Sequence, residues 1–389
     1  MLCVVDQDMV SLYGVADGFI SVLSRIRPIW LKRRLFSFIF SLYVHLLRLR
    51  DVLMQLRLSV FLVSGVEKNS GDQIRLLFIG QNNIPLFLGD ILFINPPDIE
   101  QIGRVFIWRK NKLNRFSFDV DAVLVSCDRF YRRFLHWDDF FVFPHMVDMV
   151  LDCSEGLEGI MQNLSNDAKK ETRAVRNRDF SFEITSDIDK VLMFYDDMYV
   201  PLLKKRIGKT DMFIPDFLTL RFFLQMGSEL LLTSLDGSYA SGTFFYHHDD
   251  RIELKYFGIY QGDVDLYRRR ASAADQYFSI LIALDRNVSL LDFGGARPFF
   301  GDGLFYYKQK WGMSVNKYVL VPEIIGLKIL NEKVMRSFLL KNPFIGVSQD
   351  DRFVACVFVD KEMFSDEMRV KFKETYKKPG IDEVRFINV

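Results

Sequence analysis

The chain has 389 residues, with 51 basic and 50 acidic side chains and a formal net charge of +1. This length indicates two or three domains, and the near-zero charge excludes a global positive field that would recruit nucleic acid. The cysteines form no paired motif, so we expect neither a disulfide framework nor a zinc site. The expected compartment is a reducing cytoplasm. The first ten residues, MLCVVDQDMV, carry two acids where a signal peptide needs positive charge, so secretion is not expected.

Residues 1–65 have a helical pattern in which Pro28 is the only breaker. Within them, residues 18–50 hold seven Lys or Arg and no Asp or Glu, around the apolar run LFSFIFSLYVHLL at 35–47. A run of this length is too short to span a bilayer, which takes about 20 residues. A basic-flanked apolar helix can lie in a membrane interface. The pattern leaves two interpretations open, a peripheral membrane helix and a core helix with basic ends.

From residue 66 to about 150, short apolar runs alternate with Gly, Asn and Pro turns, a pattern typical of strands. A charged helix is expected over 165–179, with Ser165 as its N-cap. The next helical stretch, 189–206, carries Pro201, which we expect to break it.

Residues 229–260 predict a three-stranded antiparallel meander, because ELLLTSL, SYASGTFFYHH and RIELKYFGIY are joined by the turns DG and DD. An Arg-rich loop, DLYRRR, and a helix without Gly or Pro at 271–284 follow. SLLDFGG is the next expected strand, and MSVNKYVLV offers a further one. The predicted order is therefore β-β-β-loop-α-β.

The start of the predicted helix at 271 is a candidate phosphate site. Free N–H groups and the helix dipole favour a pyrophosphate there. Arg268, Arg269 and Arg270 can supply positive charge, although Arg runs in loops are also commonly solvated. The helix begins with small side chains that permit close backbone approach: Ala271, Ser272, Ala273 and Ala274.

This β-loop-α-β unit resembles the GNAT acyltransferases, whose R/Q-x-x-G-x-G/A loop holds the coenzyme A pyrophosphate. Here the loop reads RRASAA, with Ser272 at the glycine position. The chain is more similar to the FemAB-like branch, which joins acyl or aminoacyl groups to peptides or sugars. NLSNDAKKETRAVRNRDFSFEI resembles its charged helix and LLDFGGARP its D-F-G-G strand end. GLFYYKQKWG resembles its G-L-x-x-F-K-x-x-[FW]-G signature, with Tyr307 in place of Phe. The resemblance spans residues 150–322.

The resemblance implies an α/β (α+β) fold with a GNAT-like mixed sheet, flanking helices and two lobes. The expected domains are a basic, apolar helical segment at 1–65, a first, degenerate lobe at 66–150, a catalytic domain at 151–322 and a small α/β appendage at 323–389. In such a fold the sheet splits to form a groove for the acyl donor.

The resemblance also implies roles for individual residues. Lys308 matches the signature lysine near the transferring acyl group, where a cation can stabilise an oxyanion. The alternative interpretation is that Lys308 and Lys310 are surface charges. Asp292 and Glu253 are the candidate general bases. Strict alternation would place Glu253, Lys255 and Phe257 on one face of their strand. The donor site would use Arg268, Arg269, Arg270, Ala271, Ser272 and Ala274. The substrate-binding candidates are Arg173, Arg176, Arg206, Tyr256, Gly294, Gly295 and Tyr307.

The function implied is transfer of an acyl group from acetyl-CoA or another acyl-CoA to an amine on a sugar, lipid-linked sugar or peptide. The implied setting is cell-envelope or polysaccharide biosynthesis in the cytoplasm, and a peripheral contact at the inner face of the membrane through 18–50 is one of the two interpretations left open for that segment. The alternatives are aminoacyl transfer from a charged tRNA and a catalytically inactive binding module.

We expect no DNA partner and no permanently bound cofactor. The HHDD run at 247–250 lies at a hairpin tip, so no metal site is expected there. Ser241 in YASGT is not a nucleophile elbow, which disfavours hydrolase chemistry.

Overall fold

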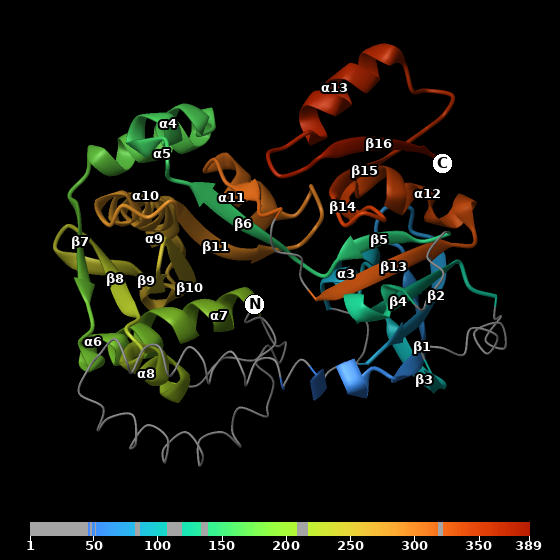
Figure 1. The fold of residues 1–389 in the computed structure, drawn as a ribbon, viewed down its shortest axis with the longest axis horizontal. Coiled ribbons are helices and arrows are strands. Elements are labelled where there is room, and N and C mark those ends of the chain that lie inside the picture. The colour runs from blue at the N-terminus through green and yellow to red at the C-terminus, as the bar shows by residue number, and fades with distance from the viewer. Residues whose placement is uncertain are drawn as a thin grey trace. The chain divides into compact units, whose positions relative to one another are not determined.

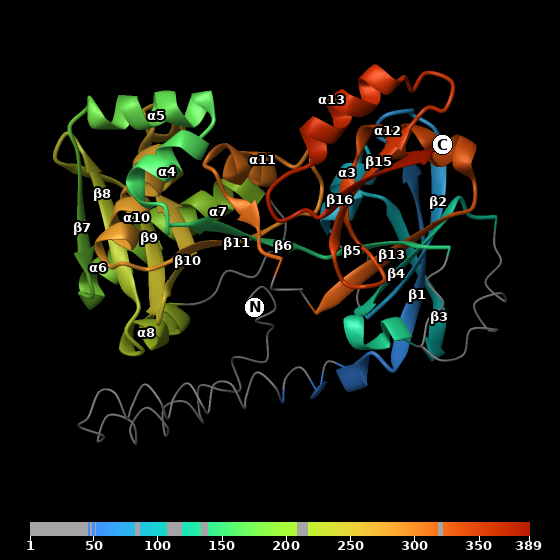
Figure 2. The same cartoon turned by 45° about the horizontal axis from the view of Figure 1, so that its top comes forward.

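The computed structural model describes residues 46, 49–50, 52–81, 86–106, 119–133, 139–207, 217–317 and 322–389 (Figures 1 and 2). The fold is mixed α/β, with six-, seven- and three-stranded sheets. The chain divides into two compact units. Of the described residues, the first contains those within Met149–Gly294 and Lys308–Met313, and the second contains those within Phe40–Asp148, Gly295–Tyr307 and Ser314–Val389.

The seven-stranded sheet has the order β12-β6-β11-β10-β9-β8-β7. The predicted meander is confirmed, because β9 pairs antiparallel with both β8 and β10. β10 then pairs parallel with β11, as the predicted β-β-β-loop-α-β order requires. The strands are β6 (Val147–Asp152), β7 (Phe180–Thr185), β8 (Glu229–Leu235), β9 (Ser238–His248), β10 (Arg251–Ile259), β11 (Leu290–Ala296) and β12 (Ser314–Val315).

Helices cover both faces of this sheet. On one face, α10 (Ala271–Asp285) contacts β8, β9 and β10 and packs against α5 (Asn166–Arg176). The predicted N-cap of α5 is confirmed, because the Ser165 side chain accepts a hydrogen bond from Ala168 N. The other face carries an apolar core formed with α6 (Ile188–Met193), η3 (Phe194–Tyr199) and α8 (Phe217–Gln225). This core includes Phe194, Met198 and Phe244. Short helices complete the unit: α4 (Gly156–Asn163), η4 (Tyr260–Gly262) and α9 (Val264–Arg268).

The prediction that Pro201 breaks its helix is wrong. Three helical segments follow one another without interruption, α6 (Ile188–Met193), η3 (Phe194–Tyr199) and α7 (Val200–Ile207), and Pro201 is the second residue of α7. A proline removes one backbone hydrogen bond and its ring crowds the carbonyl four residues earlier. The segment η3 is π-helical, and its wider turn immediately before Pro201 accommodates both effects.

The second unit contains a six-stranded sheet of order β3-β1-β2-β4-β13-β5. Residues 57–65, which were expected to continue the N-terminal helical pattern, instead form most of β1. The stretch RLSVFLVSGV is rich in residues that favour strands, and it pairs with a strand on each side. The strands are β1 (Arg57–Val66), β2 (Gln73–Gly80), β3 (Asp98–Phe106), β4 (Ala122–Asp128), β5 (Phe141–Pro144) and β13 (Glu323–Ile329).

The C-terminal residues contribute to this same sheet. Strand β13 pairs antiparallel with β4 on one side and β5 on the other, so residues 323–329 join strands from the range 66–150. The rest of the C-terminal part forms a three-stranded sheet of β14 (Phe344–Val347), β15 (Phe353–Val359) and β16 (Glu383–Asn388). The helices of the C-terminal part are α12 (Glu332–Lys341) and α13 (Asp366–Tyr376). Three further helices occur earlier in the described chain: α3 (Leu86–Leu92), η2 (Arg129–Arg133) and α11 (Gly303–Lys310).

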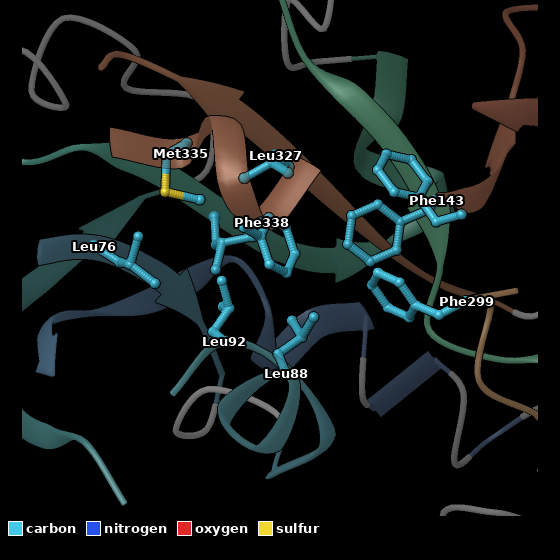
Figure 3. Close-up of a pocket in the computed structure, with 10 residues that line it drawn as sticks. Leu76, Leu88, Leu92, Phe143, Phe299, Leu327, Met335 and Phe338 are labelled. Carbon is cyan, nitrogen blue, oxygen red and sulfur yellow. The ribbon is translucent and has the colours of Figure 1, made fainter. Parts of the chain in front are cut away.

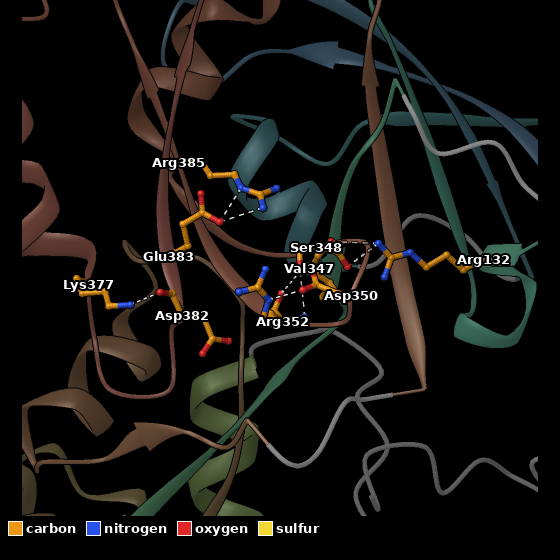
Figure 4. A network of polar contacts seen from close by, with 9 residues as sticks. All are labelled: Arg132, Val347, Ser348, Asp350, Arg352, Lys377, Asp382, Glu383 and Arg385. Atoms are coloured by element: carbon orange, nitrogen blue, oxygen red, sulfur yellow. Dashed lines mark hydrogen bonds and ion pairs between the residues drawn. The ribbon is translucent and has the colours of Figure 1, made fainter.

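Two features characterise the interior and the surface of the second unit. Leucine, phenylalanine and methionine side chains, among them Leu88, Phe143 and Phe338, surround an apolar cavity of about 10 Å³ (Figure 3), close to the smallest space that holds one water. Charged side chains around the β14–β15 turn and β16 form a polar network in which Arg132 donates to the carbonyls of Val347 and Ser348 (Figure 4).

No helix in the described part of the chain is long and apolar enough to cross a bilayer. The basic segment 18–50, for which a peripheral membrane helix and a core helix were both left open, lies outside the described residues apart from 46, 49 and 50.

Gly258 tests the packing of β10 against the π-helical segment. A Cβ atom added to Gly258 would lie 2.8 Å from backbone atoms of Met198 and Tyr199. We expect Gly258→Ala to destabilise the protein by about 1–3 kcal/mol, because an inserted methyl group forces the backbone apart. Urea denaturation measures the change. Gly301→Ala is the control, since its Cβ would meet no atom within 4 Å, and equal stabilities of the two variants would contradict the packing argument.

Candidate functional site

The seven-stranded sheet splits between β10 and β11. These parallel strands pair at only three positions, the last of which joins Glu253 to Asp292. A β-bulge follows at once, because Leu254 and Tyr256 oppose consecutive residues of β9 and leave Lys255 as the extra residue. A bulge kinks a strand and increases its twist. The two strands therefore separate after Glu253 and Asp292, as the resemblance implied, and we call this point the fork.

The bulge also corrects the expected alternation along β10. Tyr256 opposes Phe244 of β9, whereas Phe257 opposes Thr243. Tyr256 therefore shares the face of Glu253, and Phe257 lies on the opposite face, which is the reverse of the prediction. The ring of Tyr256 packs against Tyr199, at 5.2 Å between centroids, within the core on that face.

Four charged side chains meet at the fork. Glu253 accepts hydrogen bonds from Arg251, with Nε at 2.9 Å, and from Lys255 Nζ. Arg251 also lies 3.7 Å from Asp292 across the strand pair. Burial alone would raise the pKa of Glu253, but Lys255 and Arg251 outweigh it and lower this pKa to about 2. Glu253 is therefore ionised and a weak base at neutral pH.

The end of β11 is held by Asp292 and Lys308. Asp292 Oδ1 accepts from Gly294 N at 2.8 Å, and Gly294 has φ +69°, a conformation that favours glycine. Lys308 Nζ donates to the carbonyl oxygens of Phe293 and Gly294 at 2.6 and 2.9 Å. Lys308 lies on α11 and is only 6% exposed, so it is more deeply buried than a lysine at the rim of a groove. The three predicted catalytic residues thus come from β10, β11 and α11.

The helix α10 begins near the end of the part of β10 that pairs with β9 but no longer with β11. Ser241 pairs with Ile259, the last residue of β10, and its hydroxyl donates to Ala271 O at 3.2 Å. Arg270, the residue before the helix, has φ +79°, and its side chain does not cap the helix. Ala271, Ala273 and Ala274 are buried. The helix start therefore presents backbone N–H groups beside small side chains, which is the arrangement expected of an anion site.

Carboxylates accompany the arginines of the preceding loop. Arg268 pairs with Asp265 at 2.9 Å, and Arg269 pairs with Asp236. These partners reduce the positive charge that the RRR run predicted. Arg178 of the α5–β7 turn donates to Arg269 O at 2.6 Å, which holds this turn against the loop.

Glu171 of α5 joins the loop to α11. Its Oε1 lies 2.8 Å from Arg270 Nη1, and its Oε2 lies 2.8 Å from Lys310 Nζ. The Lys310 side chain is only 15% exposed, so Lys310 is an ion-paired residue and not the surface charge we expected.

The remaining predicted site residues are distributed over several elements. Arg173 and Arg176 are exposed on α5. Arg206 belongs to α7, but its side chain lies outside the described part. In the second unit, a Cβ at Gly295 would lie 2.8 Å from Met146, and Tyr307 is half-buried on α11.

Sequence reasoning missed Asp275, which is completely buried on α10. Its Oδ2 accepts from Thr243 Oγ1 of β9 at 2.5 Å. Burial raises the pKa of Asp275 to about 7, although the hydrogen bond from Thr243 opposes the shift. The available signal was helical spacing, because Asp275 is the one acid among the buried positions Ala271, Ala274 and Phe278.

No protein-family model and no curated protein matches the chain. Among solved structures, it is similar to FemX, with 14% identity, a TM-score of 0.40 and coverage of 71% of this chain and 90% of that one. It is also similar to L-PGS from Bacillus licheniformis, with 9% identity, a TM-score of 0.34 and coverage of 71% and 88%. A GCN5-related N-acetyltransferase from Anabaena variabilis has 11% identity, a TM-score of 0.28 and coverage of 75% and 63%.

Asp275 predicts a pH dependence of stability. Its folded pKa of about 7 exceeds the ordinary value of about 3.9, so the folded state binds the proton more tightly. The stability linked to this proton is complete below about pH 4 and is lost as the pH rises toward 7. We expect Asp275→Asn to remove this loss and to be more stable than the wild type at pH 8, by on the order of 2–4 kcal/mol. Urea denaturation at pH 5 and pH 8 measures it, and parallel pH profiles of the two proteins would contradict it.

Proposed function

We propose that this protein is an acyltransferase that moves an acyl group from a coenzyme A thioester to an amine. The observation that carries the proposal is the fork, because β10 continues for six residues after its pairing with β11 ends. An unpaired strand edge presents backbone N–H and C=O groups that need partners. The arm of coenzyme A contains amide groups and can pair with such an edge as an added strand does.

The start of α10 supports the same donor. Its N–H groups and dipole suit the pyrophosphate of coenzyme A. The contact between Ser241 and Ala271 places this start near Ile259, at the far end of the unpaired edge. A donor bound with its pyrophosphate at α10 and its arm along β10 would bring its thioester to the fork.

The fork offers the charges that acyl transfer needs. The amine attacks the thioester carbonyl and forms a tetrahedral oxyanion, the thiolate then leaves, and the amine loses a proton. The Lys308 ammonium is fixed by two carbonyls and can stabilise the oxyanion without reorganisation. Arg251 and Lys255 make Glu253 a weak base, so its carboxylate is better suited to attract the ammonium form of the acceptor. Asp292 is the better candidate to receive the proton.

For the acceptor we propose an amine on a sugar, a lipid-linked sugar or a peptide. The exposed guanidinium groups of Arg173 and Arg176 on α5 would hold an anionic part of that acceptor. Cell-envelope or polysaccharide biosynthesis is the setting we propose for such a reaction.

Ser272→Glu tests the donor site. Ser272 is the second residue of α10, where an acidic side chain is favourable to a helix but repels a bound phosphate. We expect the variant to fold and to bind acetyl-CoA at least tenfold more weakly than the wild type in isothermal titration. Asn166→Glu adds the same charge to the first turn of α5 and should leave affinity unchanged. Equal affinities of the wild type and Ser272→Glu would exclude this site.

Lys308→Ala tests catalysis. We expect a loss of kcat on the order of a hundredfold, together with a loss of about 1–3 kcal/mol of stability, because two partly buried carbonyls lose their donor. Lys310→Ala removes the same charge from the same helix and breaks the ion pair with Glu171, which is also the partner of Arg270. This control should change KM for the donor more than kcat.

Both effects are measured from steady-state rates at a temperature well below the unfolding temperature of each variant. The substrates are acetyl-CoA and a panel of amino sugars, peptides and polyamines. If the two lysine variants share one pattern of kcat and KM, Lys308 has no special role in the chemical step.

A further inference from the structure

A layer of buried polar side chains lies between α10 and the sheet. Thr233 of β8 opposes Ser241 of β9, and Thr243 follows two residues later on the same face. All three are buried, as are Asp275 and Ser279 on α10. Two hydrogen bonds join helix and sheet, from Ser241 to Ala271 O at 3.2 Å and from Thr243 to Asp275 Oδ2 at 2.5 Å. The first turns of α10 are thus attached to β9 through this layer.

Asp275 is incompletely satisfied in this layer. Among the described residues, Asp275 Oδ1 has no hydrogen-bond partner, and neither does the hydroxyl of Ser279 or of Thr233. A carboxylate buried with one neutral donor is poorly stabilised in its charged form. The proton that neutralises Asp275 is therefore held more tightly than in an exposed carboxyl group.

The charged groups on the elements around α10 do not stabilise the Asp275 charge. Glu171 of α5 pairs with Arg270 and Lys310, Glu229 of β8 pairs with Arg286, and Asp265 of α9 pairs with Arg268. The buried face of α5 consists of Ala168, Thr172 and Val175, and that of α4 of Ile160, all uncharged. From β9 the neighbour is the hydroxyl of Thr243, and β10 contributes Phe257 and Ile259 on this face.

Asp275 is close to the helix start along the axis of α10. It is the fifth residue of the helix, and at 1.5 Å per residue it lies about 6 Å along the axis from Ala271. An anion oxygen bound to the first N–H groups lies about 3 Å beyond them, so it would be roughly 10 Å from the carboxyl group. An ionised Asp275 would repel that anion through a protein interior of low dielectric constant, and a protonated Asp275 would not.

We propose that Asp275 is a positioning residue whose protonation state controls anion binding at the start of α10. The inference rests on the proposed function in one respect, because it takes the anion to be the pyrophosphate of the acyl donor. Below neutral pH the carboxyl group is neutral and the helix start is an anion site of full strength. Above neutral pH its charge opposes the helix dipole and affinity for the donor falls.

The test measures binding of 3′-dephospho-coenzyme A to the full chain between pH 5.5 and 8.5 by isothermal titration. The pyrophosphate diester of this probe keeps a constant charge over that range, so any pH dependence belongs to the protein. We expect the wild-type Kd to rise roughly tenfold across the range, as for unit charges about 10 Å apart at an effective dielectric constant of about 20. Asp275→Asn should bind with a constant Kd, equal to that of the wild type at low pH.

Two further variants separate this effect from a general loss of structure. Asp285→Asn removes the same charge from the exposed end of the same helix and should retain the wild-type pH dependence. Thr243→Val removes the hydrogen bond that favours the carboxylate, so the midpoint of the binding curve should move to higher pH. This second shift would not follow from a structural role alone.

Carboxyl ¹³C NMR, with Asp275 assigned by its absence from the Asp275→Asn spectrum, follows the same proton without any ligand. Titration of Asp275 below pH 5 would overturn the proposal, and so would equal Kd values of wild type and Asp275→Asn at pH 8.5. If Asp275 titrates near neutrality but neither protein binds the probe at any pH, the donor site itself is refuted, and the coupling with it. The NMR result therefore shows which of the two ideas has failed.

Discussion

The separation of β10 from β11 after Glu253 and Asp292 is the constraint on which the first unit depends. Strands that stop pairing inside a sheet leave backbone groups that must find other partners. Lys308 supplies two of the missing donors, through its hydrogen bonds to the carbonyls of Phe293 and Gly294. The bulge at Lys255 turns β10 aside, and Lys255 and Arg251 both pair with Glu253 at that point. The same separation leaves the strand edge that we assign to the donor.

Most elements of the first unit could be predicted because their signals are local. The meander follows from three strand-like runs with short turns, and α5 from its Ser165 cap. The bulge could not be predicted, since it depends on pairing with β9 and reverses the faces of Tyr256 and Phe257. The segment η3 was missed for a different reason. A π-helical turn is a response to Pro201 within a packed helix, and it leaves no mark in hydrophobic periodicity.

The candidate site was predicted as a set of residues but not as an electrostatic arrangement. The motifs indicated Lys308, Asp292 and Glu253, and the structure gathers side chains from their three elements. The charge of Glu253 is set by its near neighbours Arg251 and Lys255, but the carboxylates that pair with the loop arginines come from distant parts of the chain. Glu171 lies 99 residues before Arg270, and Asp236 lies 33 residues before Arg269. Sequence alone therefore overstated the positive charge of the loop, and it missed Asp275 because burial, not residue type, makes that carboxyl unusual.

The position of β13 has a consequence for the order in which the chain folds during synthesis. Residues 323–329 form a strand between β4 and β5, whose residues lie within 122–144. At about 5–20 residues per second, the ribosome adds the intervening residues in roughly 10–40 s. During that time β4 and β5 lack their shared neighbour, while the residues of β7 to β11 have already emerged and can fold. Unpaired strand edges promote aggregation, so the nascent chain is most vulnerable at β4 and β5 until residues 323–329 have emerged.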